Sequence, residues 1–322
     1  MEFKWKIIGN QKAVEYLDKS LSNGQIANFY IFSGQSGLGK FSLAKNFITN
    51  IFIKDLPGLK VNENFLETNS DFWVIEREAD KKNISIDQIR DFISHFQASS
   101  FMNSYRAAII KEAQYLNENS ANALLKVLEE ADNKTIIILT VDDIESLPKT
   151  IASRGQIINL FPVKDDLIYQ NLIDNFSVSP NLARSLTRLS NGCPKIALKF
   201  LDDENLYQDY GLMVNSFIDF LSQNFVERLK IINEVIKKDD ILDNFSILQI
   251  WQSVIRDLIF LHYNQYDYVK NDFALDKLKA FKTEDLNPEV LAQKSLIITK
   301  AEEYLKSNIN LRSVLEYIAV NI

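Results

Sequence analysis

Short apolar runs alternate with longer amphipathic segments over the first half of the chain. The runs are four or five residues long, lie between turn-forming residues and are typical of buried strands. They are Phe29–Ser33, Phe72–Ile75, Ala107–Ile110, Ile136–Leu139 and Ile157–Phe161, the last of which ends at Pro162. Strands that alternate with helices predict a parallel sheet covered by helices. We therefore expect residues 1–162 to form an α/β domain of the nucleotide-binding type.

The intervening segments carry apolar residues at helical spacing. One helix is predicted through Val14, Leu17 and Leu21, and further helices over Leu43–Ile48, Ile84–Phe96 and Asn119–Glu130. Ser85 or Asp87 is the expected cap of the third. After Pro162 the strand signals end, and small helices are expected over 163–205 around Asn191–Lys195. Residues 206–322 are helical in pattern, apart from a polar stretch at 267–285 expected to be a loop with one helical piece.

A glycine-rich segment, Gly34-Gln-Ser-Gly-Leu-Gly-Lys40, joins the first strand to the next helix. In this context glycines let backbone N–H groups converge on an anion at a helix N-terminus, and a lysine reaches the outer phosphates. A phosphate loop needs Ser or Thr directly after the lysine, but Phe41 stands there and Ser42 comes one residue late. The alternative is a strand-to-helix turn that keeps the shape and has lost the nucleotide.

Composition narrows the possible partners. The 322 residues carry a net charge of −7, which argues against a chain that grips DNA alone through a broad basic surface. Cys193 is the single cysteine, so disulfides are impossible and a cysteine-based zinc site is nearly excluded. Because no stretch reaches 18 apolar residues, we expect no membrane span, and we take the cytoplasm as the default location.

Motifs in a fixed order suggest a family. They are the glycine-rich segment, Ala107–Ala113, Asn122–Glu130 and Leu147–Arg154, with Ile84–Arg90 and Trp251–Asp257 in support. In this order they resemble the bacterial clamp-loader AAA+ family, densely over 1–162 and only architecturally after about residue 200. The resemblance implies an AAA+ domain, a small helical lid at 163–205 and an all-α collar at 206–322 that assembles a ring.

The resemblance also implies partners. These are ATP-hydrolysing motor subunits of the gamma/tau type and a clamp-opening delta subunit. The assembled ring would load a sliding clamp onto primer-template DNA, so the DNA contact of this chain would be shared and indirect.

The chain departs from the working ATPases of this family at the magnesium site. There the strand that corresponds to Ala107–Ile110 ends in an aspartate that helps to hold magnesium, followed by a glutamate that activates water. In this chain Lys111 takes the place of the aspartate, Glu112 is retained, and Phe41 removes the other metal-supporting side chain. We therefore predict that the magnesium site is lost and that the chain does not hydrolyse ATP. The zinc module that the family often carries is also expected to be absent, since residues 54–70 contain no cysteine.

ATP binding is a separate question and stays open at this point. The degenerate nucleotide site implied by the resemblance comprises Gly34, Gly37, Gly39, Lys40, Ser42, Ile8 on the adenine side and Lys195 near the sensor-2 basic residue. The alternative is that these are inherited core and turn positions around an empty site.

The pair Ser153-Arg154 is the stronger functional candidate. In the family this arginine points at the nucleotide of the neighbouring subunit and stabilises charge on the transferred phosphate. The next residue, Gly155, departs from the usual cysteine. The resulting hypothesis is a non-hydrolysing scaffold that donates an arginine finger in trans. The alternatives are an active motor subunit of the same machine, or a DNA repair or recombination ATPase that works alone.

Overall fold

The computed structural model describes residues 3–78, 81–96, 100, 102, 104–130, 134–237, 246–281, 287–307 and 309–322. The chain forms two compact units. Unit 1 comprises Met1–Asn171 and Gly192–Lys195, and unit 2 comprises Leu172–Asn191 and Ile196–Ile322. The domain boundaries expected at residues 162 and 205 stay a prediction.

Unit 1 is built on a five-stranded parallel sheet in the order β2-β3-β4-β1-β5. Its strands are β1 (Phe29–Ser33), β2 (Phe72–Ile75), β3 (Arg106–Ile110), β4 (Thr135–Val141) and β5 (Gln156–Asn159). Its helices are α1 (Gln11–Asn23), α2 (Lys40–Asp55), α3 (Ile86–Phe96), α4 (Glu118–Glu130) and α5 (Lys149–Ala152), with 3-10 turns η1 (Ala113–Tyr115) and η2 (Ile144–Ser146).

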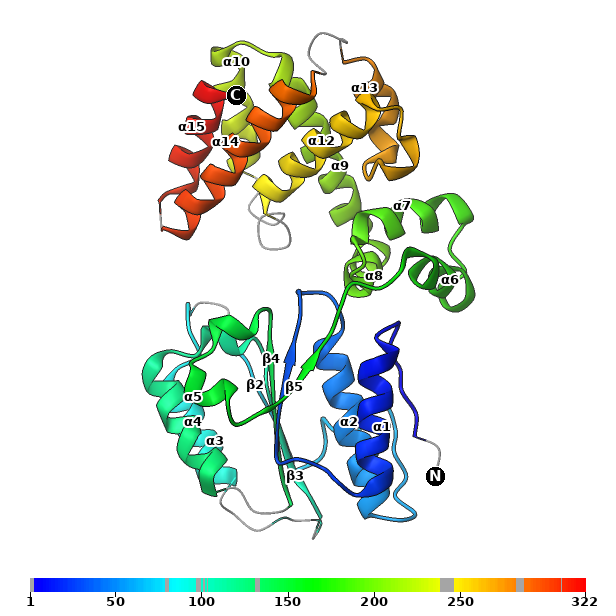
Figure 1. Ribbon diagram of the computed structural model, residues 1–322, viewed down its shortest axis with the longest axis vertical. Helices are drawn as coiled ribbons and strands as arrows, with labels where there is room; N and C mark the ends of the chain where they lie inside the picture. The colour runs from blue at the N-terminus through cyan, green and yellow to red at the C-terminus, as the bar shows by residue number, and fades with distance from the viewer. Residues whose placement is uncertain are drawn as a thin grey trace. The chain divides into compact units, whose positions relative to one another are not determined.

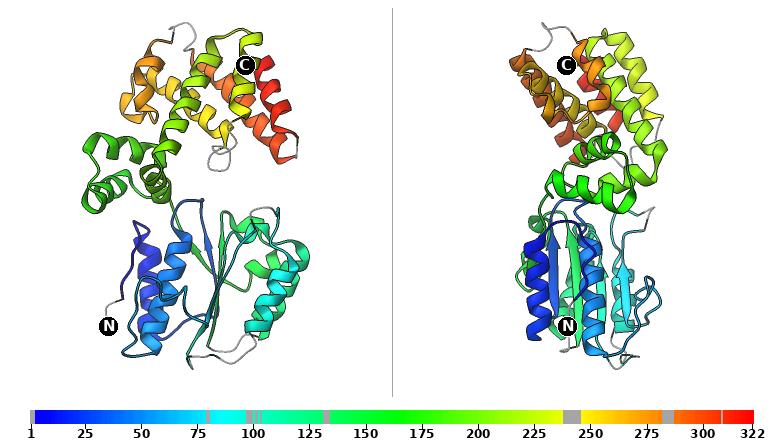
Figure 2. Two further views of the ribbon diagram at one scale, coloured as in Figure 1. Left: turned by 180° about the vertical axis from the view of Figure 1, so that it is seen from behind. Right: turned by 90° about the vertical axis from the view of Figure 1, so that its right-hand side faces the viewer.

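Helices cover both faces of this sheet. Helices α1 and α2 lie on one face, and α3, α4 and α5 lie on the other (Figure 1). The view from behind shows the same three layers (Figure 2, left). The predicted helix-covered parallel sheet is therefore confirmed, and its strand order, with a glycine-rich turn between β1 and α2, is that of an AAA+ P-loop NTPase fold.

The central strand β1 is buried over its whole length. Its side chains alternate between the two faces, as strand geometry requires. Ile31 belongs to the core shared with α3 and α4, whereas the Tyr30 ring packs edge-to-face on Phe47 of α2, with ring centroids 5.1 Å apart. Fixing β1 in this way fixes the direction in which the glycine-rich turn leaves the sheet.

Several predicted element ends differ from the structure, and the contacts explain two of the differences. Strand β5 ends at Asn159 and not at Phe161, because the Phe161 N–H donates to Oδ1 of Asn10 (2.8 Å) and Pro162 has no N–H. Ile84 does not belong to the helix, since it forms an isolated bridge with Leu116.

Helix α3 begins at Ile86, and its start follows a capping box. Ser85 and Gln88 exchange hydrogen bonds, from Gln88 N–H to Ser85 Oγ (3.3 Å) and from Ser85 N–H to Gln88 Oε1 (2.9 Å). Of the two expected caps, Ser85 is the one that acts, and Asp87 lies in the first helical turn.

Unit 2 is entirely helical over its described residues, as the pattern predicted. Helix α6 (Asp165–Phe176) continues from unit 1 into unit 2 and α8 (Pro194–Asp202) begins in unit 1. The remaining elements are α7 (Pro180–Ser190), α9 (Glu204–Ser222), α10 (Phe225–Ile236), α12 (Ile247–His262), η3 (Tyr266–Tyr268), η4 (Asp272–Ala274), α13 (Leu275–Lys279), α14 (Pro288–Lys306) and α15 (Leu311–Asn321). The expected loop at 267–285 thus holds more helical structure than predicted, and 282–286 lie outside the described residues.

A stack of aromatic rings forms the centre of unit 2. Helix α12 packs against α9 and α14, and α15 packs against α10 and α14. Trp251 of α12 is fully buried and stacks on Phe217 of α9, with centroids 4.5 Å apart.

Within the described ranges, none of the helices combines the length and apolarity that crossing a bilayer requires.

A buried carboxylate on α12 holds the turn that follows η3. Asp257 is fully buried and accepts hydrogen bonds from the N–H groups of Lys270 (2.9 Å) and Asn271 (2.8 Å) and from Asn271 Nδ2 (2.7 Å). Burial raises the pKa of the Asp257 carboxyl above its ordinary range, and these hydrogen bonds oppose that rise without cancelling it. The folded chain therefore binds this proton more tightly than the unfolded chain does.

We predict that Asp257→Asn lowers the free energy of unfolding by about 1–3 kcal/mol at neutral pH, because at least one buried donor loses its acceptor. The stability contributed by the raised pKa is fully present below the ordinary carboxyl pKa and is lost as pH rises through the folded value. The difference between wild type and variant should therefore widen as pH falls from about 7 to about 4. Urea unfolding of wild type and variant across this pH range measures the difference in unfolding free energy. A difference that narrows on acidification would contradict the raised pKa of Asp257.

Candidate functional site

The glycine-rich turn has a backbone that side chains would disrupt. Gly34 has φ of 148°, and a Cβ built on it would lie 2.4 Å from the carbonyl oxygen of Leu160, which leaves no room for any other residue. Gly37 (φ 87°) and Gly39 (φ 89°) are left-handed, and Gly39 is the N-cap of α2. The turn therefore delivers Lys40 to the first position of a helix, where free N–H groups favour anions.

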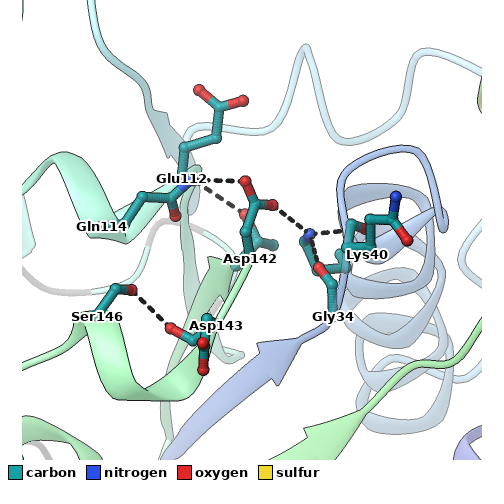
Figure 3. A network of polar contacts seen from close by, with 9 residues as sticks. Gly34, Lys40, Glu112, Gln114, Asp142, Asp143 and Ser146 are labelled. Atoms are coloured by element: carbon teal, nitrogen blue, oxygen red, sulfur yellow. Dashed lines mark hydrogen bonds and ion pairs between the residues drawn. The ribbon is translucent and has the colours of Figure 1, made fainter. Parts of the chain in front are cut away.

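The lysine of this turn is already engaged within the chain. Lys40 is buried, with 9% of its side chain exposed, and its Nζ lies 2.8 Å from Oδ1 of Asp142 (Figure 3). The same Nζ donates to the carbonyl oxygens of Gly34 and of Gln35, the latter at 3.1 Å. The second oxygen of Asp142 accepts from Nε2 of Gln114 (3.1 Å).

The residues at the expected magnesium site do not fit that ion. The Lys111 Nζ lies 4.9 Å from the centre of the Phe41 ring and is ion-paired with Glu76. Lys45 approaches the same ring, with its Nζ 5.6 Å from the centre. Magnesium needs oxygen ligands in octahedral geometry, and the side chains of Phe41 and Lys111, at the two positions expected to support the ion, carry no oxygen. Within the described residues, no group of three or more His, Cys, Asp or Glu side chains is placed to hold a metal.

Glu112, the retained glutamate, is positioned by a hydrogen bond of its backbone N–H. Glu112 adopts a left-handed conformation (φ 52°), and its N–H donates to Thr140 Oγ1 at 3.0 Å. Its carboxylate points away from Lys40 and Asp142 (Figure 3). This orientation does not present a base to a ligand on the glycine-rich turn.

The predicted nucleotide site also includes Ser42, Ile8 and Lys195, which differ in their exposure and contacts. Ser42 is exposed, and its carbonyl oxygen accepts from Asn46 Nδ2 (2.7 Å). Ile8 is half-buried. Lys195 has an exposed side chain, and its backbone N–H donates to the carbonyl of Gly37 (3.1 Å), so this residue does contact the turn.

Arg154 lies at the other end of the sheet from Lys40. It follows α5, whose C-cap is Ser153, and precedes the amino end of β5. Because Gln156 pairs with Tyr30 and Asn159 with Ser33, the four residues of β5 separate Arg154 from the level of the glycine-rich turn, roughly 13 Å along the strand. The Arg154 side chain is 42% exposed, donates to the Thr150 carbonyl (2.8 Å) and pairs with Glu129 of α4 (2.7 Å).

Packing accounts for the glycine that follows the arginine. A Cβ on Gly155 would lie 2.7 Å from Cδ1 of Ile31 and 2.9 Å from a ring carbon of Phe29, both in the buried strand β1. A cysteine at this position would press into the core. The departure from the family pattern therefore reflects the side chains of β1.

Four side chains that contact the predicted site residues or their partners carry no role in the sequence-based hypothesis. They are Asp142 and Gln114 beside Lys40, Glu76 beside Lys111, and Glu129 beside Arg154. A signal existed for Asp142 and Glu76, since each directly follows a strand of the sheet, and the carboxyl ends of parallel strands meet at one edge.

Comparison with known proteins supports one family. Residues 9–164 match the model of the family described as DNA polymerase III, delta subunit. The chain is 22% identical to DNA polymerase III subunit delta' of Bacillus subtilis, over 99% of this chain and 98% of the relative. It is 27% identical to DNA polymerase III subunit gamma/tau of Mycoplasma genitalium, over 88% of this chain but 50% of that relative.

A third relative, DNA polymerase III subunit tau of Bacillus subtilis, is 32% identical over 47% of this chain and 27% of its own length. The chain thus spans about half or less of the gamma/tau relatives described here. By these matches the chain is a relative of the clamp-loader subunits of DNA polymerase III, a group that includes the delta' and gamma/tau proteins.

Proposed function

We propose that this chain is the delta' subunit of a DNA polymerase III clamp loader and does not hydrolyse ATP itself. The observation that carries the proposal is the Lys111 ammonium 4.9 Å from the Phe41 ring, in the place where a working ATPase of this fold presents oxygen ligands. The alignment over nearly the full length of a delta' relative supports it further.

Without a metal, phosphoryl transfer lacks its main electrostatic support. Mg²⁺ bridges the β- and γ-phosphate oxygens and neutralises the charge that develops there. A lysine at position 111 offers no oxygen ligand to such a cation, and its ion pair with Glu76 engages it within the chain. The orientation of Glu112 adds to this, because its carboxylate points away from Lys40.

Arg154 acts in this proposal on the nucleotide of a neighbouring subunit. Its position at the amino end of β5 keeps it roughly 13 Å along the strand from the level of its own glycine-rich turn. The Arg154 side chain is 42% exposed and that of its partner Glu129 is 56% exposed, so the pair is screened by water and opens at little cost. Arg154 can leave Glu129 when a neighbouring subunit presents the phosphate groups of its nucleotide, which carry more negative charge.

The partners of the ring follow from this role. Motor subunits of the gamma/tau type hydrolyse ATP, a delta subunit opens the sliding clamp, and the assembled ring places the clamp on primer-template DNA in the cytoplasm. The helices of 206–322 form the collar through which the subunits assemble. The net charge of −7 is consistent with a DNA contact that is shared with other subunits.

The two alternatives require features that this chain lacks. An active motor needs a hydroxyl at position 41 and an acid at position 111. A DNA repair or recombination ATPase that works alone needs the same residues.

We predict that the purified chain, supplied with ATP and magnesium, shows no turnover above that of its Lys40→Ala variant. The variant is the matched blank, because it removes the only lysine of the glycine-rich turn and controls for contaminating ATPases. Phosphate release measures both. Turnover that Lys40→Ala abolishes would show that Phe41 and Lys111 do not disable the site.

We further predict that Arg154→Ala lowers clamp-dependent ATP turnover in a ring reconstituted with motor and delta subunits. An arginine finger contributes about 10³-fold or more at the site that it serves. With that site silenced, total turnover should fall by about the share that one motor site contributes, while the mass of the assembled ring stays unchanged.

Lys149→Ala is the control, because it removes one exposed positive charge from α5, the helix that leads into Arg154. It should leave turnover at the wild-type level. Equal losses in both variants would assign the effect to general charge, and unchanged turnover in Arg154→Ala would overturn the finger while leaving the scaffold role.

A further inference from the structure

Asp142 stands beside the lysine that a phosphate loop offers to its ligand. It is the first residue after β4, and the Gly34 N–H at the start of the turn donates to the carbonyl of Val141, the last residue of that strand (3.1 Å). The Asp142 carboxylate lies 2.8 Å from the Lys40 Nζ (Figure 3). The lysine is thus paired with an anion that belongs to the chain.

Both oxygens of the Asp142 carboxylate have a partner within the chain. Oδ1 faces Lys40, and Oδ2 accepts from Nε2 of Gln114 at 3.1 Å. The reverse orientation of the Gln114 amide would set its oxygen against the carboxylate, so the network allows one arrangement. Gln114 in turn belongs to η1, next to the buried residue Ala113. The carboxylate is therefore positioned by a neighbouring element and does not depend on Lys40 alone.

From this geometry we infer that Asp142 closes the glycine-rich turn to nucleotide. Its carboxylate takes the place that a phosphate oxygen of ATP would occupy at Lys40. A triphosphate has to displace this carboxylate and then remain beside its negative charge, without a magnesium ion to offset the repulsion. Position 142 thus decides whether the loop binds a nucleoside triphosphate, and an uncharged residue there opens the loop to a metal-free one.

The size of the effect follows from the exposure of the pair. Lys40 is buried, but the Asp142 side chain is 47% exposed, so water screens part of the interaction. Two unit charges in contact in a dry protein interior would interact more strongly than this partly solvated pair does. We expect removal of the charge to tighten ATP binding at least about tenfold.

The test compares ATP affinity of the full chain and three variants by titration calorimetry in buffer containing EDTA. Asp142→Asn removes the charge and keeps the side-chain volume. Asp143→Asn is the matched control, since Asp143 carries the same charge one residue on and caps η2 by accepting from the Glu145 N–H at 3.0 Å. The third variant combines Asp142→Asn with Lys40→Ala. Thermal unfolding of each variant shows that it is folded, and Asp142→Ser serves in place of Asp142→Asn if that variant is not.

The expected result is ATP binding at least about tenfold tighter in Asp142→Asn than in wild type, no gain in Asp143→Asn, and loss of the gain when Lys40 is also replaced. Equal affinities in wild type and Asp142→Asn, whether tight or undetectable, would overturn the inference. So would an equal gain in Asp143→Asn, or a gain that survives Lys40→Ala. Because the test scores binding by the isolated chain, its failure leaves the ring role and Arg154 untouched.

Discussion

The parallel register of β1 with its two neighbours determines the chemistry of this chain. Ser33, the last residue of β1, pairs with Val141 of β4 and with Asn159 of β5. Because the three strands run in one direction, the residues that follow them emerge together at one edge of the sheet. Lys40 and Asp142 are separated by 102 positions in the sequence, yet the register brings their charged groups to 2.8 Å.

The same register separates the two functional candidates. Residues that precede β5 emerge at the opposite edge from the glycine-rich turn, and Arg154 is one of them. The distance between Arg154 and the glycine-rich turn is set by the length of β5, so a local rearrangement near Arg154 does not close it. Under the proposed function an arginine in this position serves a phosphate on another chain, and that role is compatible with the closed loop that we infer for the same subunit.

The sequence predicted the α/β half well because its strands carry a strong local signal. Apolar runs bounded by turn residues located β1 and β2 to the residue and β3 and β4 to within two residues at either end. The end of β5 was missed because it depends on the distant side chain of Asn10, whose amide pairs with the Phe161 backbone. Gln114 beside Asp142 and Glu129 beside Arg154 were missed for the same reason. Register and helix placement bring them together, and a local pattern carries neither.

The glycines of the turn are weaker support for nucleotide binding than their spacing suggests. Gly34 is required by the carbonyl of Leu160 alone, 2.4 Å from where a Cβ would lie, and that contact exists without any ligand. Lys40 also has a structural role, because its ammonium satisfies the carbonyls of Gly34 and Gln35. Both parts of the motif are therefore accounted for by the fold of the chain itself. Under the inference that Asp142 closes this turn, a phosphate site differs from a turn of the same shape in the charge that faces the lysine, which here is the carboxylate of Asp142.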